Sequence, residues 1–105
     1  MKAKQKVKTY KFYSDSGHGW LAVKKEDLVM LCIVGDISRY SYTKGDTVYL
    51  EEDCDFPKFF RALNAEGLSF NYVSVYHEGR SRIRSYDSYS AEKFIEELAG
   101  DSCED

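Results

Sequence analysis

The strongest constraint on the fold is an order of segments that occurs three times along the chain. In each occurrence, two β-rich runs flank a short turn containing glycine, and a segment of different periodicity follows. Glycine supplies the backbone freedom that tight turns need, and turns of this kind join antiparallel strands. The sequence therefore predicts three β-hairpins, formed by residues 7–15 with 20–23, 37–42 with 47–51, and 68–76 with 81–86.

The segment after the second predicted hairpin has the clearest helical pattern. Asp55 is expected to cap the N-terminus of this helix, Pro57 fits its first turn, and Gly67 is expected to end it. Its apolar residues recur at the spacing of one helix face. They are Phe56, Phe59, Phe60 and Leu63.

Two more helices are expected, one after each of the other predicted hairpins. Residues 24–33 place Leu28, Leu31 and Cys32 on one helix face. Near the C-terminus, Ser90 can cap a third helix. The apolar face of that helix would comprise Ala91, Phe94, Ile95 and Leu98.

These elements predict the fold class. Each predicted helix has only one apolar stripe to bury, and the simplest way to bury all three stripes is to pack the helices on one face of a common sheet. We therefore expect an α+β fold, with an antiparallel sheet of about six strands in three ββα units and the helices on one face. A chain of 105 residues fits one domain, expected at 7–99 between a flexible basic arm (1–6) and an acidic tail (100–105).

Composition and charge exclude several classes of function. The net charge of −3 argues against phosphate binding driven by overall charge. Because no apolar run approaches bilayer length and no signal peptide is evident, we expect a cytoplasmic protein without membrane contact. The three cysteines, at positions 32, 54 and 103, form no CxxC pair and are interpreted as free thiols. No cofactor is expected.

The acidic run EEDCD precedes the second predicted helix. Glu51 and Glu52 alternate across a strand, so they are poor candidates for a paired-carboxylate site. Cys54 lies at a helix N-terminus, but Asp53 and Asp55 should raise its pKa, which argues against a nucleophilic thiol. A divalent cation held by these two aspartates and a glutamate is an alternative. The run lacks the alternating acids and glycine of an EF-hand, so no metal site is predicted.

Two histidines lie in glycine-containing turns, where binding and catalytic groups often concentrate. His18 is in SGHGW and His77 is in YHEGRS. If the turns converge, His18, His77 and Arg80 could process a phosphoester, with histidine moving the proton and arginine holding the anion. The simpler interpretation is that each histidine is an exposed turn residue.

Arginine and tyrosine supply the candidate binding residues. On a strand, Arg80, Arg82 and Arg84 would share one face and could grip an anionic partner, or they could pair internally with EEDCD. Nine tyrosines suit an interface, although they could equally fill half-buried strand positions. The candidate binding residues are Tyr40, Tyr42, Tyr49, Glu52, Asp53, Arg80, Arg82 and Arg84.

Four stretches, YSDSGHGWLAV, ISRYSY, VYLEEDCD and HEGRSRIRSY, resemble a group of short hypothetical proteins carried by bacteria, phages and plasmids. The resemblance covers most of residues 10–86, and it implies no catalytic residue. It implies a genetic context in which small cytoplasmic proteins often bind and block host defence machinery.

Three functional hypotheses follow. The favoured one is a non-catalytic binding protein with a protein partner, in one form an inhibitor of a host defence enzyme or nucleoprotein, and a homo-oligomer is compatible with it. The alternative is a small phosphoester-processing enzyme that uses His18, His77 and Arg80. The third, less favoured, is a nucleic-acid-binding accessory that uses the basic arm and the arginine run.

Overall fold

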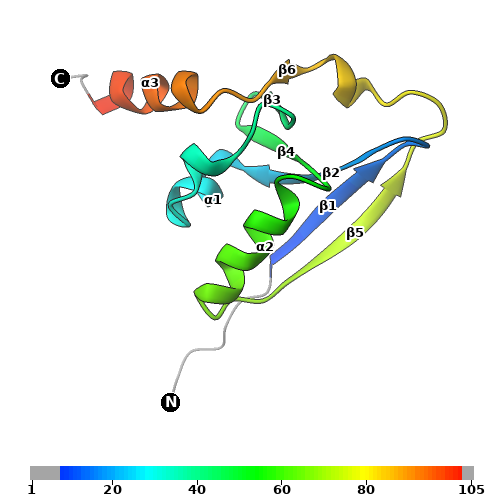
Figure 1. The fold of residues 1–105 in the computed structure, drawn as a ribbon, viewed down its shortest axis with the longest axis horizontal. Coiled ribbons are helices and arrows are strands. Elements are labelled where there is room, and N and C mark those ends of the chain that lie inside the picture. The colour runs from blue at the N-terminus through cyan, green and yellow to red at the C-terminus, as the bar shows by residue number, and fades with distance from the viewer. Residues whose placement is uncertain (1–7, 103–105) are drawn as a thin grey trace.

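The computed structural model describes residues 8–102, so the predicted basic arm (1–6) and residues 103–105 of the predicted tail lie outside the described part. The strands are β1 (Lys8–Ser14), β2 (Gly19–Lys24), β3 (Tyr42–Lys44), β4 (Thr47–Glu51), β5 (Phe70–Tyr76) and β6 (Asp87–Ser88). The α-helices are α1 (Lys25–Met30), α2 (Phe56–Ala65) and α3 (Ala91–Ser102), and two short 3₁₀ helices span Val34–Asp36 and Arg82–Ser85 (Figure 1).

The strands form one mixed sheet in the order β5-β1-β2-β4-β3-β6. The α+β class, the number of strands and the mostly antiparallel pairing are confirmed, as is the hairpin β1–β2. The second hairpin forms as β3–β4, but its first strand begins at Tyr42 and not at residue 37. The third predicted hairpin is wrong. β5 runs parallel to β1, with Phe12 opposite Ser74. In the strand order, β5 lies at one edge of the sheet and β6 at the other.

Residues 81–86 do not form the predicted strand. The side chain of Ser81 accepts a hydrogen bond from the Ile83 N–H, and a 3₁₀ helix follows in which Ile83 is buried. Because β5 and β6 occupy opposite edges, the intervening chain crosses the sheet and does not return beside β5. The three ββα units are therefore not formed, and Arg80, Arg82 and Arg84 do not share a strand face.

The core lies between the sheet and helices α1 and α2, which contribute to one apolar cluster and so cover the same face. Alternation along the strands points Leu21 and Leu50, which are paired, toward these helices. α2 begins at Phe56 and ends before Gly67 (φ +72°), as expected. The most deeply buried apolar residues of this core are Leu21, Val23, Leu28, Val48, Leu50 and Phe59, and Trp20, outside this cluster, is equally buried.

α1 is shorter than the predicted helix 24–33. Leu28 and Leu31 are buried, as their spacing predicts, but Cys32 is exposed. Cys32 has a φ of +60°, the left-handed conformation that commonly ends helices, and its N–H donates to the Val29 carbonyl oxygen. The chain turns there, so Cys32 does not lie on the buried face.

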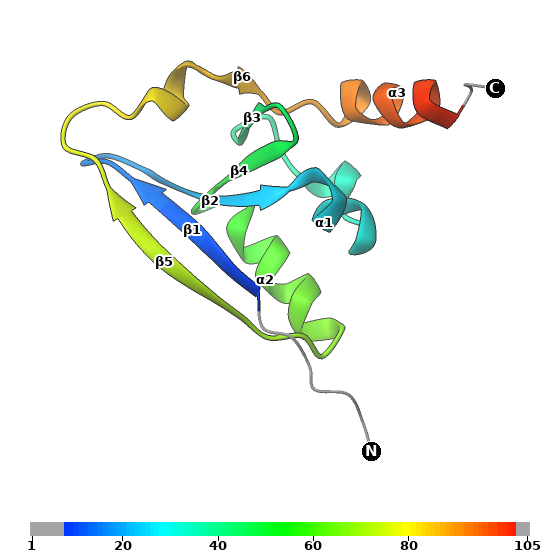
Figure 2. The same cartoon turned by 180° about the vertical axis from the view of Figure 1, so that it is seen from behind.

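α3 departs from the sheet beside β6 and projects away from it (Figures 1 and 2). Ser90 caps it as predicted, since its Oγ accepts the Lys93 N–H at 3.2 Å. Of the predicted apolar face, Phe94 is buried, but Ile95 and Leu98 are exposed. The helix continues through Gly100, where the tail was expected to begin, to Ser102.

Candidate functional site

Residues 77–86, here called the crossover segment, pass from the end of β5 toward β6 at the other edge of the sheet (Figure 2). They cover the sheet face opposite α1 and α2. The guanidinium carbon of Arg84 lies 5.7 Å from the centre of the Trp20 ring, and the Tyr86 ring lies 5.3 Å from that of Tyr49. Trp20 and Tyr49 adjoin Leu21 and Leu50 in the strands, so they point to this opposite face.

Asp15, in the turn between β1 and β2, anchors the crossover segment. Its side chain is only 1% exposed, and Oδ2 accepts hydrogen bonds from the Ser81 N–H at 2.9 Å and Arg84 Nε at 2.8 Å. Oδ1 accepts from Arg84 Nη2 at 2.7 Å and from the N–H groups of Gly17 and His18. The hydrogen bonds from Arg84 and Ser81, followed by those from the turn, hold the pKa of Asp15 well below its usual range.

Sequence reasoning missed Asp15 as a site residue. The local part of its role had a signal, because an aspartate two residues before a glycine is typical of a turn stabilised by its side chain. The remote part had none, since Arg84 lies 69 residues away in the chain. Arg84 does pair internally, but with Asp15 and not with EEDCD.

A first cavity, here called the Trp20 cavity, has a volume of about 310 Å³. It lies where the β1–β2 turn, the loop before β3, the end of β4 and the crossover segment meet. The Tyr42 ring packs at 6.2 Å from that of Trp20, edge to face. The cavity is lined by His18, Trp20, Tyr40, Tyr42, Glu51, Asp53, Cys54 and Arg84.

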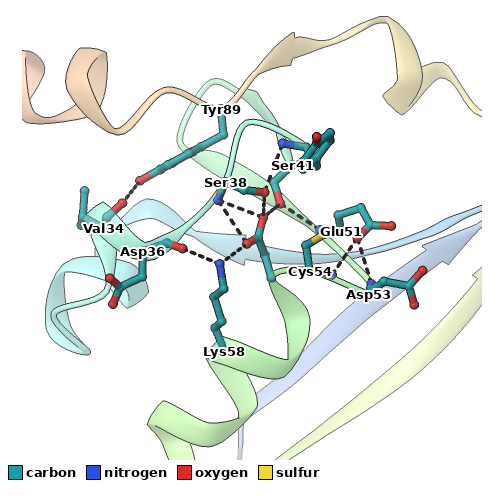
Figure 3. Close-up of polar contacts among 11 residues, drawn as sticks. Val34, Asp36, Ser38, Ser41, Glu51, Asp53, Cys54, Lys58 and Tyr89 are labelled. Carbon is teal, nitrogen blue, oxygen red and sulfur yellow. Dashed lines mark hydrogen bonds and ion pairs between the residues drawn. The ribbon is translucent and has the colours of Figure 1, made fainter.

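The acidic side of the Trp20 cavity is occupied by local hydrogen bonds (Figure 3). Glu51 Oε1 accepts the N–H groups of Asp53 at 2.9 Å and Cys54 at 2.8 Å. Desolvation raises the pKa of the Cys54 thiol, and the hydrogen bond and charge of Glu51, with the charge of Asp55, raise it further. The predicted direction is confirmed, although Glu51 contributes where Asp53 was expected to.

Asp55 does not cap α2 with its side chain, although it stands at the N-cap position. Its carboxylate is fully buried and accepts hydrogen bonds from Ser38, Ser41 and Lys58 (Figure 3). The carboxylate thus holds residues 37–41 as a loop, so the predicted strand 37–42 is wrong except at Tyr42. Within residues 8–102, no group of three or more His, Cys, Asp or Glu is placed to hold a metal.

A second cavity, here called the tyrosine–arginine cleft, has a volume of about 530 Å³. Among the described residues, no carboxylate lines it. The ring centres of Tyr13 and Tyr49 are 6.1 Å apart, and burial, followed by the neighbouring Tyr86 and Tyr13, raises the pKa of Tyr49. The cleft is lined by Tyr13, Tyr49, Val75, Tyr76, His77, Arg80, Ser81, Arg82, Ile83 and Tyr86.

Arg80 and Arg82 are the available cations of this cleft. Both are exposed, and neither side chain forms an ion pair or a hydrogen bond within the described part of the chain. Lys44 adds a third charge nearby, since its Nζ lies 5.2 Å from the centre of the Tyr86 ring. The cleft therefore combines unpaired positive charge with aromatic surface.

The structure divides the predicted site residues. Tyr40, Tyr42, Asp53 and Arg84 line the Trp20 cavity, whereas Tyr49, Arg80 and Arg82 line the cleft. Glu52 lines neither of the two, and its Oε1 instead lies against Gly19.

The two histidine turns lie close together, but their rings do not share a cavity. The His77 N–H donates to the Ser14 carbonyl oxygen at 2.8 Å, which places it beside the β1–β2 turn. His18 nevertheless lines the Trp20 cavity, while His77 and Arg80 line the cleft. The arrangement gives no support to a catalytic set of His18, His77 and Arg80.

Comparison of the chain with protein-family models, curated proteins and solved structures found no match. None of the helices within residues 8–102 is both long enough and apolar enough to cross a bilayer.

Proposed function

We propose that the chain is a non-catalytic binding protein whose binding surface is the tyrosine–arginine cleft and whose partner is a protein with an exposed acidic segment. The observation that carries this proposal is the pair of guanidinium groups, Arg80 and Arg82, which have no ion-pair partner in residues 8–102 and lie beside tyrosine rings in a cleft that no described carboxylate lines. An unpaired arginine can bind a carboxylate through two parallel hydrogen bonds.

The aromatic lining supports a protein partner. Tyrosine and arginine are the residue types enriched at the energetic centres of protein interfaces. Tyr13, Tyr49 and Tyr86 are half-buried and already packed on one another, so they would lose little conformational entropy on binding. Tyr76, at the rim, is 62% exposed.

The resemblance to proteins of phages and plasmids suggests a more specific form of this proposal. In that form the partner is a host defence enzyme or a nucleoprotein complex, which the chain inhibits by occupying its surface. This more specific proposal uses the same binding residues, and identification of the captured partner tests it.

The test is affinity capture from a nuclease-treated bacterial lysate. The wild-type chain is compared with the double variant Arg80→Glu and Arg82→Glu, and with the control Arg39→Glu and Arg61→Glu, two exposed arginines outside the cleft. Both doubles change the net charge equally. We expect a protein that the wild type and the control retain and the cleft variant loses. Equal capture by all three would contradict the proposal.

One observation favours nucleic acid as a second candidate partner. Tyr13 and Tyr49 also line a neighbouring cavity of about 530 Å³, whose charged lining residues are Lys8, Lys11, Lys24, Glu26 and Asp27. The packed rings of Tyr13, Tyr49 and Tyr86 therefore have Lys11 on one side and Arg80 and Arg82 on the other. Single strands use such surfaces for stacking and phosphate contact, although Lys8 is already paired with Asp27 and Lys24 with Asp46.

Fluorescence anisotropy with a labelled single-stranded oligonucleotide separates the two partners. Under the leading proposal the oligonucleotide binds weakly, and capture of the protein survives nuclease treatment. Tight binding that weakens steeply with salt, together with loss of capture after nuclease, would replace the protein partner by nucleic acid.

A further inference from the structure

We propose that β5 is a self-association edge, at which two copies of the chain join their sheets through antiparallel β5–β5 pairing. β5 ends the strand order in the described part of the chain, so one side of its backbone pairs with β1 and the other side pairs with no strand of the sheet. Such an edge presents N–H and C=O groups that can hydrogen-bond to another strand.

The composition of β5 leaves this edge unprotected. Its seven residues, FNYVSVY, contain no charge and no proline, which are the usual devices that keep edge strands apart. Four of its large side chains are exposed, Tyr72 and Val73 at 50%, Val75 at 39% and Tyr76 at 62%. A strand of seven residues, exposed along all but its first residue, can pair with a strand of another chain.

The sequence of β5 can pair with a second copy of itself without opposing charges, and this is the argument for a second copy as the partner. In an antiparallel pair centred on Val73, each Phe70 lies opposite the Tyr76 of the other copy, and Val73 lies opposite Val73. Aromatic and β-branched cross-strand pairs of this kind stabilise sheets, and the absence of charge removes any like-charge repulsion. The two-fold axis would pass through the Val73 pair, perpendicular to the sheet.

This geometry also keeps the helices compatible with pairing. A two-fold axis perpendicular to the sheet places α2 of both copies on the same face. α2 packs near the start of β5, where the Phe60 and Phe70 rings lie 5.6 Å apart. In the antiparallel pair, the two α2 helices would therefore lie at opposite ends of the joined strands and not against each other.

Disulfide cross-linking tests the pairing and its register. In a background with Cys32, Cys54 and Cys103 changed to Ser, the Val73→Cys variant places two thiols directly opposite, where the Cα separation suits a disulfide. In the matched Val75→Cys variant each thiol faces Asn71 of the other copy, four residues from its counterpart. With oxidised glutathione as the oxidant, we expect a covalent dimer from Val73→Cys and little from Val75→Cys.

Sedimentation equilibrium tests the association without a covalent bond. We expect the wild type to dimerise as concentration rises, Val73→Lys to remain monomeric, and Phe60→Lys, a matched exposed position on α2, to dimerise as the wild type does. The cleft variant Arg80→Glu with Arg82→Glu should still dimerise, which separates this inference from the proposed function.

The inference has clear contrary results. A wild type that stays monomeric from about 10 to 500 μM would overturn it, because the dissociation constant of the dimer would then exceed ~1 mM, which is too weak for specific pairing. Equal cross-linking of Val73→Cys and Val75→Cys would also overturn it. A monomer whose β5 captures a different protein, with capture lost in Val73→Lys, would also overturn it and assign the edge to another chain.

Discussion

The two faces of the sheet are closed in different ways. On one face, α1 and α2 bury an apolar core in which Leu28, Leu50 and Phe59 are fully inaccessible. On the other face, the crossover segment is the cover, and it is held by the carboxylate of Asp15 and the buried side chain of Ile83. Cavities lined by tyrosine, histidine and arginine remain on either side of this segment.

Under the proposed function, this difference would separate the source of stability from the binding surface within one small sheet. The helix face is held together by apolar burial, which is non-directional and closes space. The crossover face buries only a few apolar side chains, among them Trp20 and Ile83, and depends more on directional hydrogen bonds to Asp15, which position a segment without filling all the space around it. Residues that need access to a partner can therefore gather on the second face at little cost to the core.

The largest expected effect is a break in the helix face. Phe59→Ala should lower the free energy of unfolding by about 3–5 kcal/mol, because it leaves a cavity in a fully buried site. Phe60→Ala is the matched control, since Phe60 is 45% exposed, and it should cost less than about 1 kcal/mol. Urea unfolding measures both, and equal losses would contradict the assignment of this face as the main source of stability.

A smaller effect is expected from releasing the crossover segment. Asp15→Asn keeps one acceptor but loses the charge that Arg84 binds. Hydrogen exchange at residues 81–84 should accelerate by at least ~10-fold, while exchange in α2 changes little, because the segment opens locally. Asp53→Asn, at an exposed carboxylate, should leave exchange unchanged. Uniform acceleration over the whole chain would mean that Asp15 supports the core as well.

The stabilisation that the Asp15 carboxylate provides on the crossover face should depend on pH. Because the folded pKa of Asp15 is below its unfolded value of about 3.9, its stabilisation is complete above that value and is lost as pH falls toward the folded pKa. The difference in thermal midpoint between the wild type and Asp15→Asn should stay constant above about pH 5 and shrink below about pH 4. A difference that grows in acid would reverse the sign of this linkage.

The smallest expected effect comes from the free arginines. Arg82→Ala should change the free energy of unfolding by less than about 0.5 kcal/mol, because its exposed side chain has no partner in the described residues. Arg84→Ala, two positions later, should destabilise the protein more, since it leaves buried Asp15 without its guanidinium. Urea unfolding of both variants checks this, and equal losses would show that the crossover segment is not anchored through Arg84.

Local pattern was enough to predict about half of the fold. The glycine turns identified the hairpins β1–β2 and β3–β4, and the spacing of Phe59 and Leu63 identified α2, because these features depend on residues close together in the chain. The third hairpin failed although its residues had the same local appearance. The β-rich run 70–76 does form a strand, but the sequence carried no signal that it pairs in parallel with β1.

Several residues that line the two cavities were named from the sequence, but their arrangement was not. The tyrosines, the arginines and the histidines in turns could be named as candidates from residue type alone, because such groups often serve in binding sites. The tertiary structure alone decided that Arg84 binds Asp15, that Asp55 holds the loop at Ser38, and that His18 and His77 line separate cavities. The physical reason is that a buried carboxylate takes the donors that the packed backbone brings to it, and the chain order does not reveal which donors those are.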